Sequence, residues 1–386
     1  MDLPTTAAAR DRAVATFHAT WSGEPDVLVR APGRVNLIGD HTDHQEGFVL
    51  PMAVDRDVWI AARASAEPRV QVVSAEESGV VALDVAPSRP PVNGWGAYVE
   101  GMLWALTGEG LELCGWQGAL ASDVPVGAGL SSSAALELAV GLAACAVSRV
   151  DTPAPTRLAQ LAQRAENDWV GMNCGIMDQL SVARGRAGHA LKIDCRSLEV
   201  EDVPLPTDLA VLVLDTMTRR ELATSAYNER RAECAAAAAA FGVNVLRDVD
   251  IADVAKADLP DPVGRRARHV VTENARVQAA SAALSAGDPA RFGAEMAASH
   301  ASLRNDYEVS TSALDAIVAA AASQPGCHGA RLTGAGFGGC AVALVRGDAA
   351  DTIAAAVTHG YEVATGLTPT VTVCRAADGA AVVTAP

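Results

Sequence analysis

Lysine is almost absent from this chain. Only Lys192 and Lys256 occur among its 386 residues, and neither follows a glycine. A P-loop requires a lysine directly after its last glycine, so the sequence contains no P-loop. Basic residues are outnumbered as well, with 30 lysines and arginines against 46 acidic residues and a formal net charge of −16. This balance argues against a nucleic-acid or anionic-membrane partner, because both are polyanions.

Paired cysteines and long apolar runs are also missing. No two of the eight cysteines have CxxC spacing, so we expect reduced thiols and neither a zinc site nor a redox motif. The longest apolar run, residues 138–147, is too short to span a membrane. Residues 1–19 contain no apolar core of signal-peptide length. The simplest expectation is therefore a cytoplasmic protein.

The length and composition predict two packed domains. Half of the 386 residues are apolar and a fifth are charged, which is typical of a globular protein. The clearest change along the chain is a segment with two prolines at residues 201–208, before an apolar strand predicted at 209–214. We place the domain boundary there, giving residues 1–202 and 203–386.

A dense polar cluster follows the first predicted strand, residues 27–29, which the pair Pro32-Gly33 is expected to end. The cluster consists of Asp40, His41, Asp43 and His44. Carboxylates accept hydrogen bonds from hydroxyl groups, so the cluster suits a polyhydroxyl ligand. A solvated turn and a metal site at the two histidines remain alternatives.

A glycine- and serine-rich segment begins a predicted helix at residues 134–144. Gly127 and Gly129 allow close backbone approach to a ligand and positive φ angles. Three serines follow where the helix begins, and free N–H groups at a helix start bind anions. The segment therefore predicts a phosphate site, with an ordinary N-capped helix as the alternative.

Two further segments carry unusual residues. Four glycines at residues 334–339 precede an apolar strand predicted at 340–345, so either another backbone or a ligand must pack closely there. Apolar residues at helical spacing from 158 to 165 place Glu166 near a helix end, which Gly171 interrupts. Asp178 is expected in a short loop beyond it. Taken by themselves, Glu166 and Asp178 are typical of surface acids.

These segments together resemble a known family. Three motifs have the order found in GHMP kinases: PGRVNLIG at 32–39, GAGLSSSAA at 127–135 and GAGFGG at 334–339. Within that superfamily, NLIGDHTD at 36–43 and GIMDQ at 175–179 resemble the galactokinases. The similarity extends from about residue 30 to residue 345.

The resemblance implies an α+β fold of two domains. The N-terminal domain would resemble ribosomal protein S5 domain 2, the C-terminal domain would be ferredoxin-like, and the active site would lie in the cleft between them. The implied reaction transfers the γ-phosphoryl group of ATP to the anomeric hydroxyl of galactose. It gives galactose 1-phosphate, as in galactose catabolism by the Leloir pathway.

The resemblance also implies roles for individual residues. Asp178 would take or orient the proton of the anomeric hydroxyl, and Arg34 would keep it ionised and offset charge on the γ-phosphate. Ser133 and Glu166 would bind Mg²⁺. The implied sugar-binding residues are Asp40, His41, Thr42, Asp43, Gly175 and Tyr227. The implied nucleotide-binding residues are Gly127, Ala128, Gly129, Leu130, Ser131, Ser132, Ser133, Trp95 and Ser74.

The chain departs from the usual galactokinase motif at two positions. Asp40 and His44 stand where the family usually has glutamate and tyrosine, and Asp40 is one methylene shorter. A related sugar, such as arabinose, galacturonate or N-acetylgalactosamine, therefore remains an alternative substrate. Two further alternatives are a non-catalytic sugar sensor and a kinase for a non-sugar alcohol. The sequence does not indicate an oligomeric state.

Overall fold

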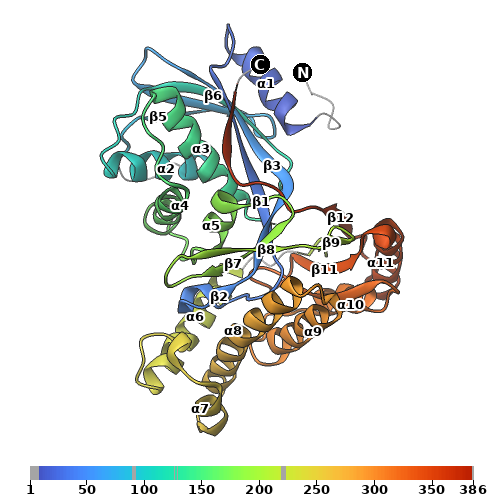
Figure 1. Cartoon of the computed structure of the whole chain (residues 1–386). Coiled ribbons are helices and arrows are strands. Elements are labelled where there is room, and N and C mark those ends of the chain that lie inside the picture. Colours follow the sequence, from blue (N-terminus) through green and yellow to red (C-terminus); the bar gives the residue numbers. More distant parts are fainter. Residues whose placement is uncertain (1–7, 89–92, 126, 128, 219–222, 385–386) are drawn as a thin grey trace.

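The computed structural model describes residues 8–88, 93–125, 127, 129–218 and 223–384. Helices and strands occur in both halves of the chain, which confirms the predicted α+β class. Figure 1 shows an upper part around the long strands β1 (Val27–Asn36) and β3 (Pro51–Ala64). The lower part holds the helices from α6 (Ala223–Ala240) to α11 (Ala350–Thr365).

A six-stranded sheet of order β13-β1-β3-β6-β4-β5 forms the centre of the upper part. Its other strands are β4 (Arg69–Ser74), β5 (Val80–Asp84), β6 (Trp116–Ser122) and β13 (Ala381–Thr384). Helix α1 (Ala9–Thr20) packs on one face through Phe17. The helices α2 (Gly96–Gly108) and α3 (Ser132–Ser148) contribute to the large apolar core on the other face.

Strand β1 is longer than predicted. Residues 27–29 do form a strand, but Pro32-Gly33 does not end it, because β1 continues to Asn36 through a register shift against β3. β13 pairs only with residues 27–30, so the Pro32 position has no ladder partner on that side and tolerates the missing N–H. The extension carries Arg34 toward the centre of the molecule.

Two smaller sheets lie below this core. One has the order β2-β7-β8, formed by Phe48–Val49, His189–Asp194 and Val200–Pro204. The other has the order β10-β11-β9-β12, formed by Cys327–Leu332, Cys340–Arg346, Leu209–Asp215 and Thr370–Cys374. β9 and β11 confirm the strands expected at 209–214 and 340–345.

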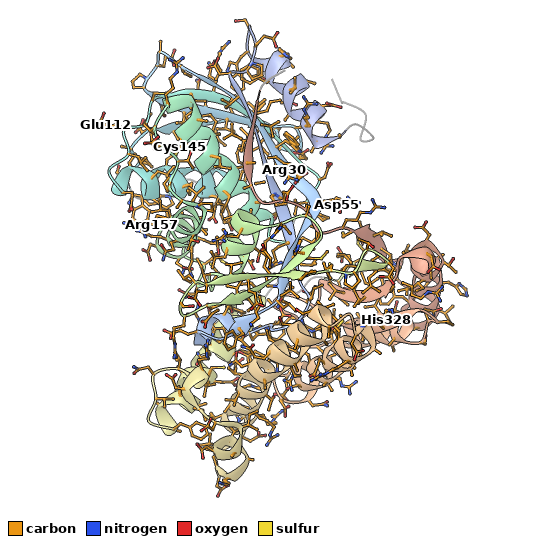
Figure 2. All side chains as sticks on the ribbon, viewed as in Figure 1. Arg30, Asp55, Glu112, Cys145, Arg157 and His328 are labelled. Atoms are coloured by element: carbon orange, nitrogen blue, oxygen red, sulfur yellow. The ribbon has the colours of Figure 1, made fainter. Side chains whose placement is uncertain are left out.

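The chain returns to its first sheet at the end. Arg30, labelled in Figure 2, donates hydrogen bonds to the carbonyl oxygens of Asp378 (2.5 Å) and Gly379 (3.1 Å). These bonds hold the segment that leads into β13 beside β1. β8 and β9 lie in different sheets, but β13 joins the N-terminal sheet, so the division at residue 203 stays a prediction.

The remaining helices connect these sheets. They are α4 (Pro155–Arg164), α5 (Met177–Arg184), α7 (Ile251–Lys256), α8 (Val263–Ser285), α9 (Pro289–Asn305) and α10 (Ser312–Ala322). Four short turns of helix are η1 (Asp43–Gln45), η2 (Ala165–Val170), η3 (Leu246–Asp248) and η4 (Gly347–Ala349). Asp178 lies in the first turn of α5, not in the loop that the sequence predicted.

The lower part has its own apolar core. It joins β9, β10 and β11 to α8, α10 and α11 through residues such as Leu212, Ile317 and Val357, all fully buried. Within the described ranges, no helix combines the length and apolar character needed to cross a membrane.

Two helical glycines allow a matched test of packing. A Cβ added at Gly293 in α9 would lie 1.7 Å from the carbonyl oxygen of His328, whereas one at Gly360 in α11 would meet only Ala320 at 3.4 Å. Gly293→Ala should therefore destabilise the protein by about 3 kcal/mol, the upper end of ordinary overpacking costs. Gly360→Ala should be neutral or stabilise by up to about 1 kcal/mol, since alanine favours helix. Urea unfolding measures both; equal effects would contradict the packing described here.

Candidate active site

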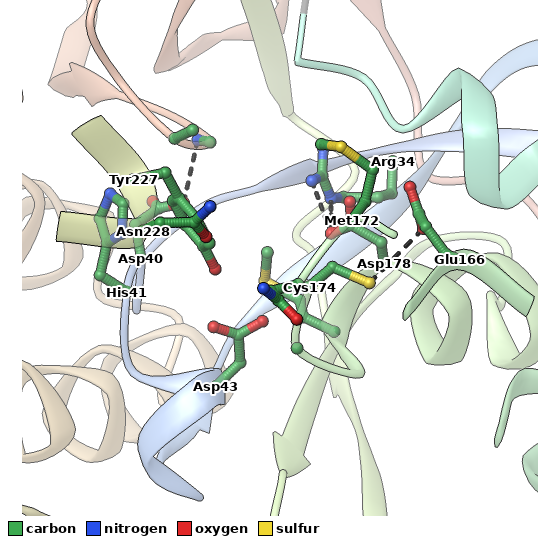
Figure 3. A pocket seen from close by; sticks show the side chains of 15 residues that line it. Arg34, Asp40, His41, Asp43, Glu166, Met172, Cys174, Asp178, Tyr227 and Asn228 are labelled. Atoms are coloured by element: carbon green, nitrogen blue, oxygen red, sulfur yellow. Dashed lines mark hydrogen bonds and ion pairs between the residues drawn. The ribbon is translucent and has the colours of Figure 1, made fainter. Parts of the chain in front are cut away.

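A cavity of about 250 Å³ lies where the two parts meet. Many predicted site residues line it: Arg34, Asp40, His41, Asp43, Glu166, Gly175, Asp178 and Tyr227. The other lining residues are Met172, Asn173, Cys174, Met177, Asn228, Gly334 and Ala335. Met177, Gly334 and Ala335 lie in motifs of the sequence analysis, which gave none of these seven residues a role. In Figure 3, Arg34, Asp178 and Glu166 lie at one side of the cavity, and Asp40, His41 and Tyr227 at the other.

An ion pair between Arg34 and Asp178 forms one end of the cavity. The Nε and Nη2 atoms of Arg34 lie 2.8 and 2.5 Å from Oδ1 of Asp178. The other carboxylate oxygen, Oδ2, accepts a hydrogen bond from the Ser131 hydroxyl. Arg34 is buried and also donates to the carbonyl oxygen of Gly129. The pair therefore joins strand β1, helix α5 and the glycine-rich loop.

The glycine-rich loop has the geometry expected of an anion site. Gly127 and Gly129 have φ angles of 71° and 77°, as their glycine identity allows. Ser131 precedes α3 in a left-handed conformation, and no side chain caps this helix start in the described part of the chain. The first N–H groups of α3, which begins with Ser132 and Ser133, are thus open to an anion. Ala128 lies outside the described residues.

The loop is pressed against β1. The Leu130 carbonyl oxygen accepts a hydrogen bond of 3.0 Å from the Arg34 N–H. A Cβ at Gly33 would lie 2.9 Å from the same oxygen, so only glycine fits there without displacement. This contact explains why the Pro-Gly pair precedes Arg34.

Glu166 is a buried acid in the π-helical turn η2. Burial raises its pKa to about 7 and the nearby Asp178 adds to the shift, while the Ser133 hydroxyl acts in the opposite direction. Its Oε2 atom accepts a bond of 2.7 Å from Gln179 Nε2. Two carboxylates and a hydroxyl in this arrangement suit a hard cation such as Mg²⁺ that keeps waters and phosphate oxygens as further ligands.

Among the described residues, no group of three or more His, Cys, Asp and Glu side chains could enclose a metal ion.

His41 faces the cavity from the opposite side. It has a left-handed φ of 63° and is buried, and among the described residues neither ring nitrogen makes a hydrogen bond of normal geometry. Its ring packs on Tyr227 and Tyr307 at centroid distances of 5.6 and 4.5 Å. Burial lowers its pKa well below the usual value, and the imidazole can then both donate and accept. A buried ring with unmet hydrogen-bonding capacity suits a ligand hydroxyl.

Asp40 lines the cavity, and Arg331 and Gly334 hold its carboxylate in place. Oδ2 accepts from Nη2 of the fully buried Arg331 at 2.5 Å, and Oδ1 accepts from the Gly334 N–H at 2.9 Å. Asp40 therefore joins the loop after β1 to the third glycine-rich motif. The sequence analysis gave Arg331 no role.

Asp43 and Gly175 are in close contact. A Cβ at Gly175 would lie 2.0 Å from Oδ2 of Asp43, so this position requires glycine. Burial, with Asp178 second, raises the pKa of Asp43 to about 6. Thr42 instead supports the loop, since its hydroxyl lies 2.9 and 2.7 Å from the Gly39 and Phe48 carbonyl oxygens.

Three further predictions concern the third glycine-rich motif, Trp95 and Ser74. The third glycine-rich motif packs against backbone, because Cβ atoms at Gly336 and Gly338 would meet the carbonyl oxygens of Val309 and Thr218 at 2.4 and 2.8 Å. Trp95 is half-buried beside α2, and the Ser74 hydroxyl lies 3.2 Å from Glu76 Oε2. Neither of these two residues lines the cavity, and their nucleotide contacts stay predictions.

The raised pKa of Glu166 predicts a pH-dependent stability difference. The folded state keeps this proton up to about pH 7, whereas the unfolded chain loses it near the ordinary 4.5. The folded state thus binds more protons between these values, and this group's contribution to stability falls as pH rises through them.

The free energy of unfolding of Glu166→Gln should therefore rise relative to that of the wild type between pH 5 and pH 8, by up to about 3 kcal/mol. Urea unfolding at both pH values measures the gain. Glu109→Gln is the control. Glu109 is exposed, and its ion pair with Arg157 lowers its pKa. A difference between Glu166→Gln and wild type that does not change with pH would contradict the burial effect.

Comparisons with known proteins show which family the chain is similar to. The galactokinase galactose-binding signature matches residues 15–64. The N-terminal and C-terminal GHMP kinase models match residues 97–186 and 280–363. The galactokinase of Roseiflexus sp. is 48% identical over 370 residues, 94% of each chain, and that of Chloroflexus aurantiacus is 45% identical over 95% of each.

Solved structures give the same result. The Lactococcus lactis galactokinase, complexed with galactose, superimposes with a TM-score of 0.90 at 35% identity, covering 95% of this chain and 98% of that one. A mevalonate kinase shares the fold at a TM-score of 0.65 and 18% identity, over 90% of this chain and 98% of that one. The predicted GHMP kinase fold is thereby confirmed, and the chain belongs to the galactokinase family.

Proposed function

We propose that the chain transfers the γ-phosphoryl group of ATP to the anomeric hydroxyl of galactose, giving galactose 1-phosphate. Its membership of the family makes it an ATP-dependent sugar kinase. The observation that carries the assignment of roles is the Arg34–Asp178 pair, which lies between a glycine-rich helix start and a cavity lined by Asp40, His41 and Asp43.

The sugar occupies the cavity with its anomeric hydroxyl toward Asp178. His41, Asp43 and Tyr227 offer hydrogen-bonding groups on the other side of the ring. Burial and Asp43 keep the pKa of Tyr227 well above its usual value, so this residue stays a neutral phenol that can donate to a sugar oxygen. Thr42 supports this side of the site through its hydroxyl group, and its contact with the sugar stays a prediction.

Asp178 accepts or orients the proton of the attacking hydroxyl. Its Oδ2 atom already accepts a hydrogen bond from Ser131, and Oδ1 is held by Arg34. This fixes the carboxylate within reach of one sugar hydroxyl, and positioning is what phosphoryl transfer mainly requires. Arg34 offsets negative charge that develops on the transferred group.

The phosphates of ATP bind at Gly127 to Ser133, where the start of α3 and the loop offer N–H groups. Ser133 and Glu166 would hold Mg²⁺, which would supply positive charge against the phosphate oxygens. The crowding of Glu166 and Asp178 supports this, since a bound cation relieves their repulsion. Trp95 and Ser74 are proposed to approach the nucleotide, on the family resemblance alone.

A related sugar is the second candidate. The shorter side chain at Asp40 is held by Arg331 and Gly334, so its reach toward a distal sugar hydroxyl is limited. His44 turns instead toward Tyr307, with 3.3 Å between its Nε2 and the phenol oxygen. Both departures concern the sugar side and leave the phosphoryl-transfer residues in place.

The substrate is tested by ADP release from MgATP with galactose, glucose, arabinose, galacturonate and N-acetylgalactosamine, with a sugar-free sample as control. Galactose should give the highest kcat/KM. Turnover of another sugar alone would contradict the galactose assignment and identify Asp40 and His44 as the first positions to change. Binding of ATP and galactose without any ADP release would instead indicate a sugar sensor.

The role of Asp178 is tested by Asp178→Asn, which keeps the shape and removes the charge. We expect kcat to fall by about 10²–10⁴-fold, as for loss of a general base. The dissociation constant of MgATP, measured by calorimetry, should change little. Asp168→Asn, at an exposed acid on η2, is the matched control and should keep full activity. A kcat for Asp178→Asn close to that of wild type would remove Asp178 from the reaction.

A further inference from the structure

Arg331 is a fully buried arginine in strand β10 that the proposed mechanism does not use. Its Nη2 atom lies 2.5 Å from Oδ2 of Asp40 and 3.9 Å from Oε1 of Glu273, a fully buried acid in α8. Among the described residues, its Nε and Nη1 atoms make no hydrogen bond of normal geometry. A buried ion pair with unmet donors adds little stability, because desolvation offsets its attraction. The position of Arg331 is therefore better explained by its effect on Asp40.

The backbone around Asp40 is held by the same part of the protein. The Gly39 N–H donates to Glu273 Oε1 at 3.0 Å. The Nε2 atom of His269, another fully buried residue of α8, lies 3.1 Å from the Asp40 carbonyl oxygen. Helix α8 thus fixes the main chain of residues 39–40, while Arg331 fixes the Asp40 carboxylate at the sugar side of the cavity.

Glu273 is itself held from two further directions. Ser299 of α9 donates to its Oε1 atom at 2.5 Å, and Arg276 donates from Nε to its Oε2 atom at 2.6 Å. Burial opposes ionisation of Glu273, but Arg276 and other neighbours lower its pKa to about 2. Burial also raises the pKa of Asp40, and the charge of Arg331 is the strongest influence in the opposite direction. Arg331 therefore supplies positive charge beside two buried acids.

We propose that Arg331 is a positioning residue for sugar binding: its guanidinium group holds the Asp40 carboxylate in one place and so sets the hydrogen bond that Asp40 offers to a sugar hydroxyl. Arg331 does not line the cavity, so it acts on the sugar through Asp40. Arginine suits this role because its planar group is permanently charged and directs its N–H groups rigidly. The inference rests on the proposed function, in which Asp40 is a sugar-binding residue.

The test is the dissociation constant of galactose, measured by calorimetry without nucleotide, together with kcat and the KM values of galactose and MgATP. Arg331→Met removes the charge at similar length. It should weaken galactose binding and raise the galactose KM by about 10–100-fold, as for a lost hydrogen bond to a charged group. The KM of MgATP should stay within about twofold of wild type. Arg331→Lys keeps the charge but not the rigid geometry, so its galactose affinity should lie between wild type and Arg331→Met. It also covers the case that Arg331→Met does not fold.

Two further variants separate positioning from a general loss of structure. Arg266→Met removes another buried arginine, which pairs with Glu233 and Glu308, and should leave galactose binding within about threefold of wild type. In an Asp40→Asn background, Arg331→Met should weaken galactose binding by less than about threefold, because the carboxylate through which Arg331 acts is already gone.

Three outcomes would overturn the positioning role alone. They are galactose binding unchanged in both Arg331 variants, equal weakening by Arg331→Met with Asp40 and with Asn at position 40, and equal weakening in Arg266→Met. A wild-type protein that binds no galactose would instead contradict the proposed function, and the role of Arg331 with it.

Discussion

The ion pair between Arg34 and Asp178 connects the parts of the site that do chemistry. Arg34 comes from β1 and Asp178 from α5, 144 residues apart in the chain, and Ser131 and Gly129 of the glycine-rich loop bind the same two side chains. The backbone bond from Arg34 to Leu130 holds the loop against the strand. The proposed phosphate-binding groups and the proposed proton acceptor are therefore aligned by one set of contacts.

Around this pair the protein keeps several acids out of water. Burial raises the pKa values of Asp43, Glu166 and Glu137, and each also feels at least one neighbouring acid. Such an arrangement lowers stability near neutral pH, and natural proteins tolerate it where function requires it. A magnesium ion and the hydroxyl groups of a sugar are the ligands that would compensate these groups.

Local patterns in the sequence predicted part of this structure. The β-branched and apolar run at β9 and the alanines of α3 form the expected elements, because packing and propensity agree there. Pro32-Gly33 gave a wrong strand end, since the bulge depends on β3 and on the short reach of β13. The family motifs, rather than spacing alone, brought Arg34 and Asp178 together. The sequence assigned no role to Arg331, whose contact with Asp40 depends on the fold.

The most direct test is a crystal structure with galactose and a non-hydrolysable MgATP analogue. It should place the anomeric oxygen within hydrogen-bond distance of Asp178, the γ-phosphate between Arg34 and the start of α3, and the metal on Ser133 and Glu166. A sugar that presents a different hydroxyl to Asp178, or phosphates bound away from residues 127–133, would contradict the assignment of this site.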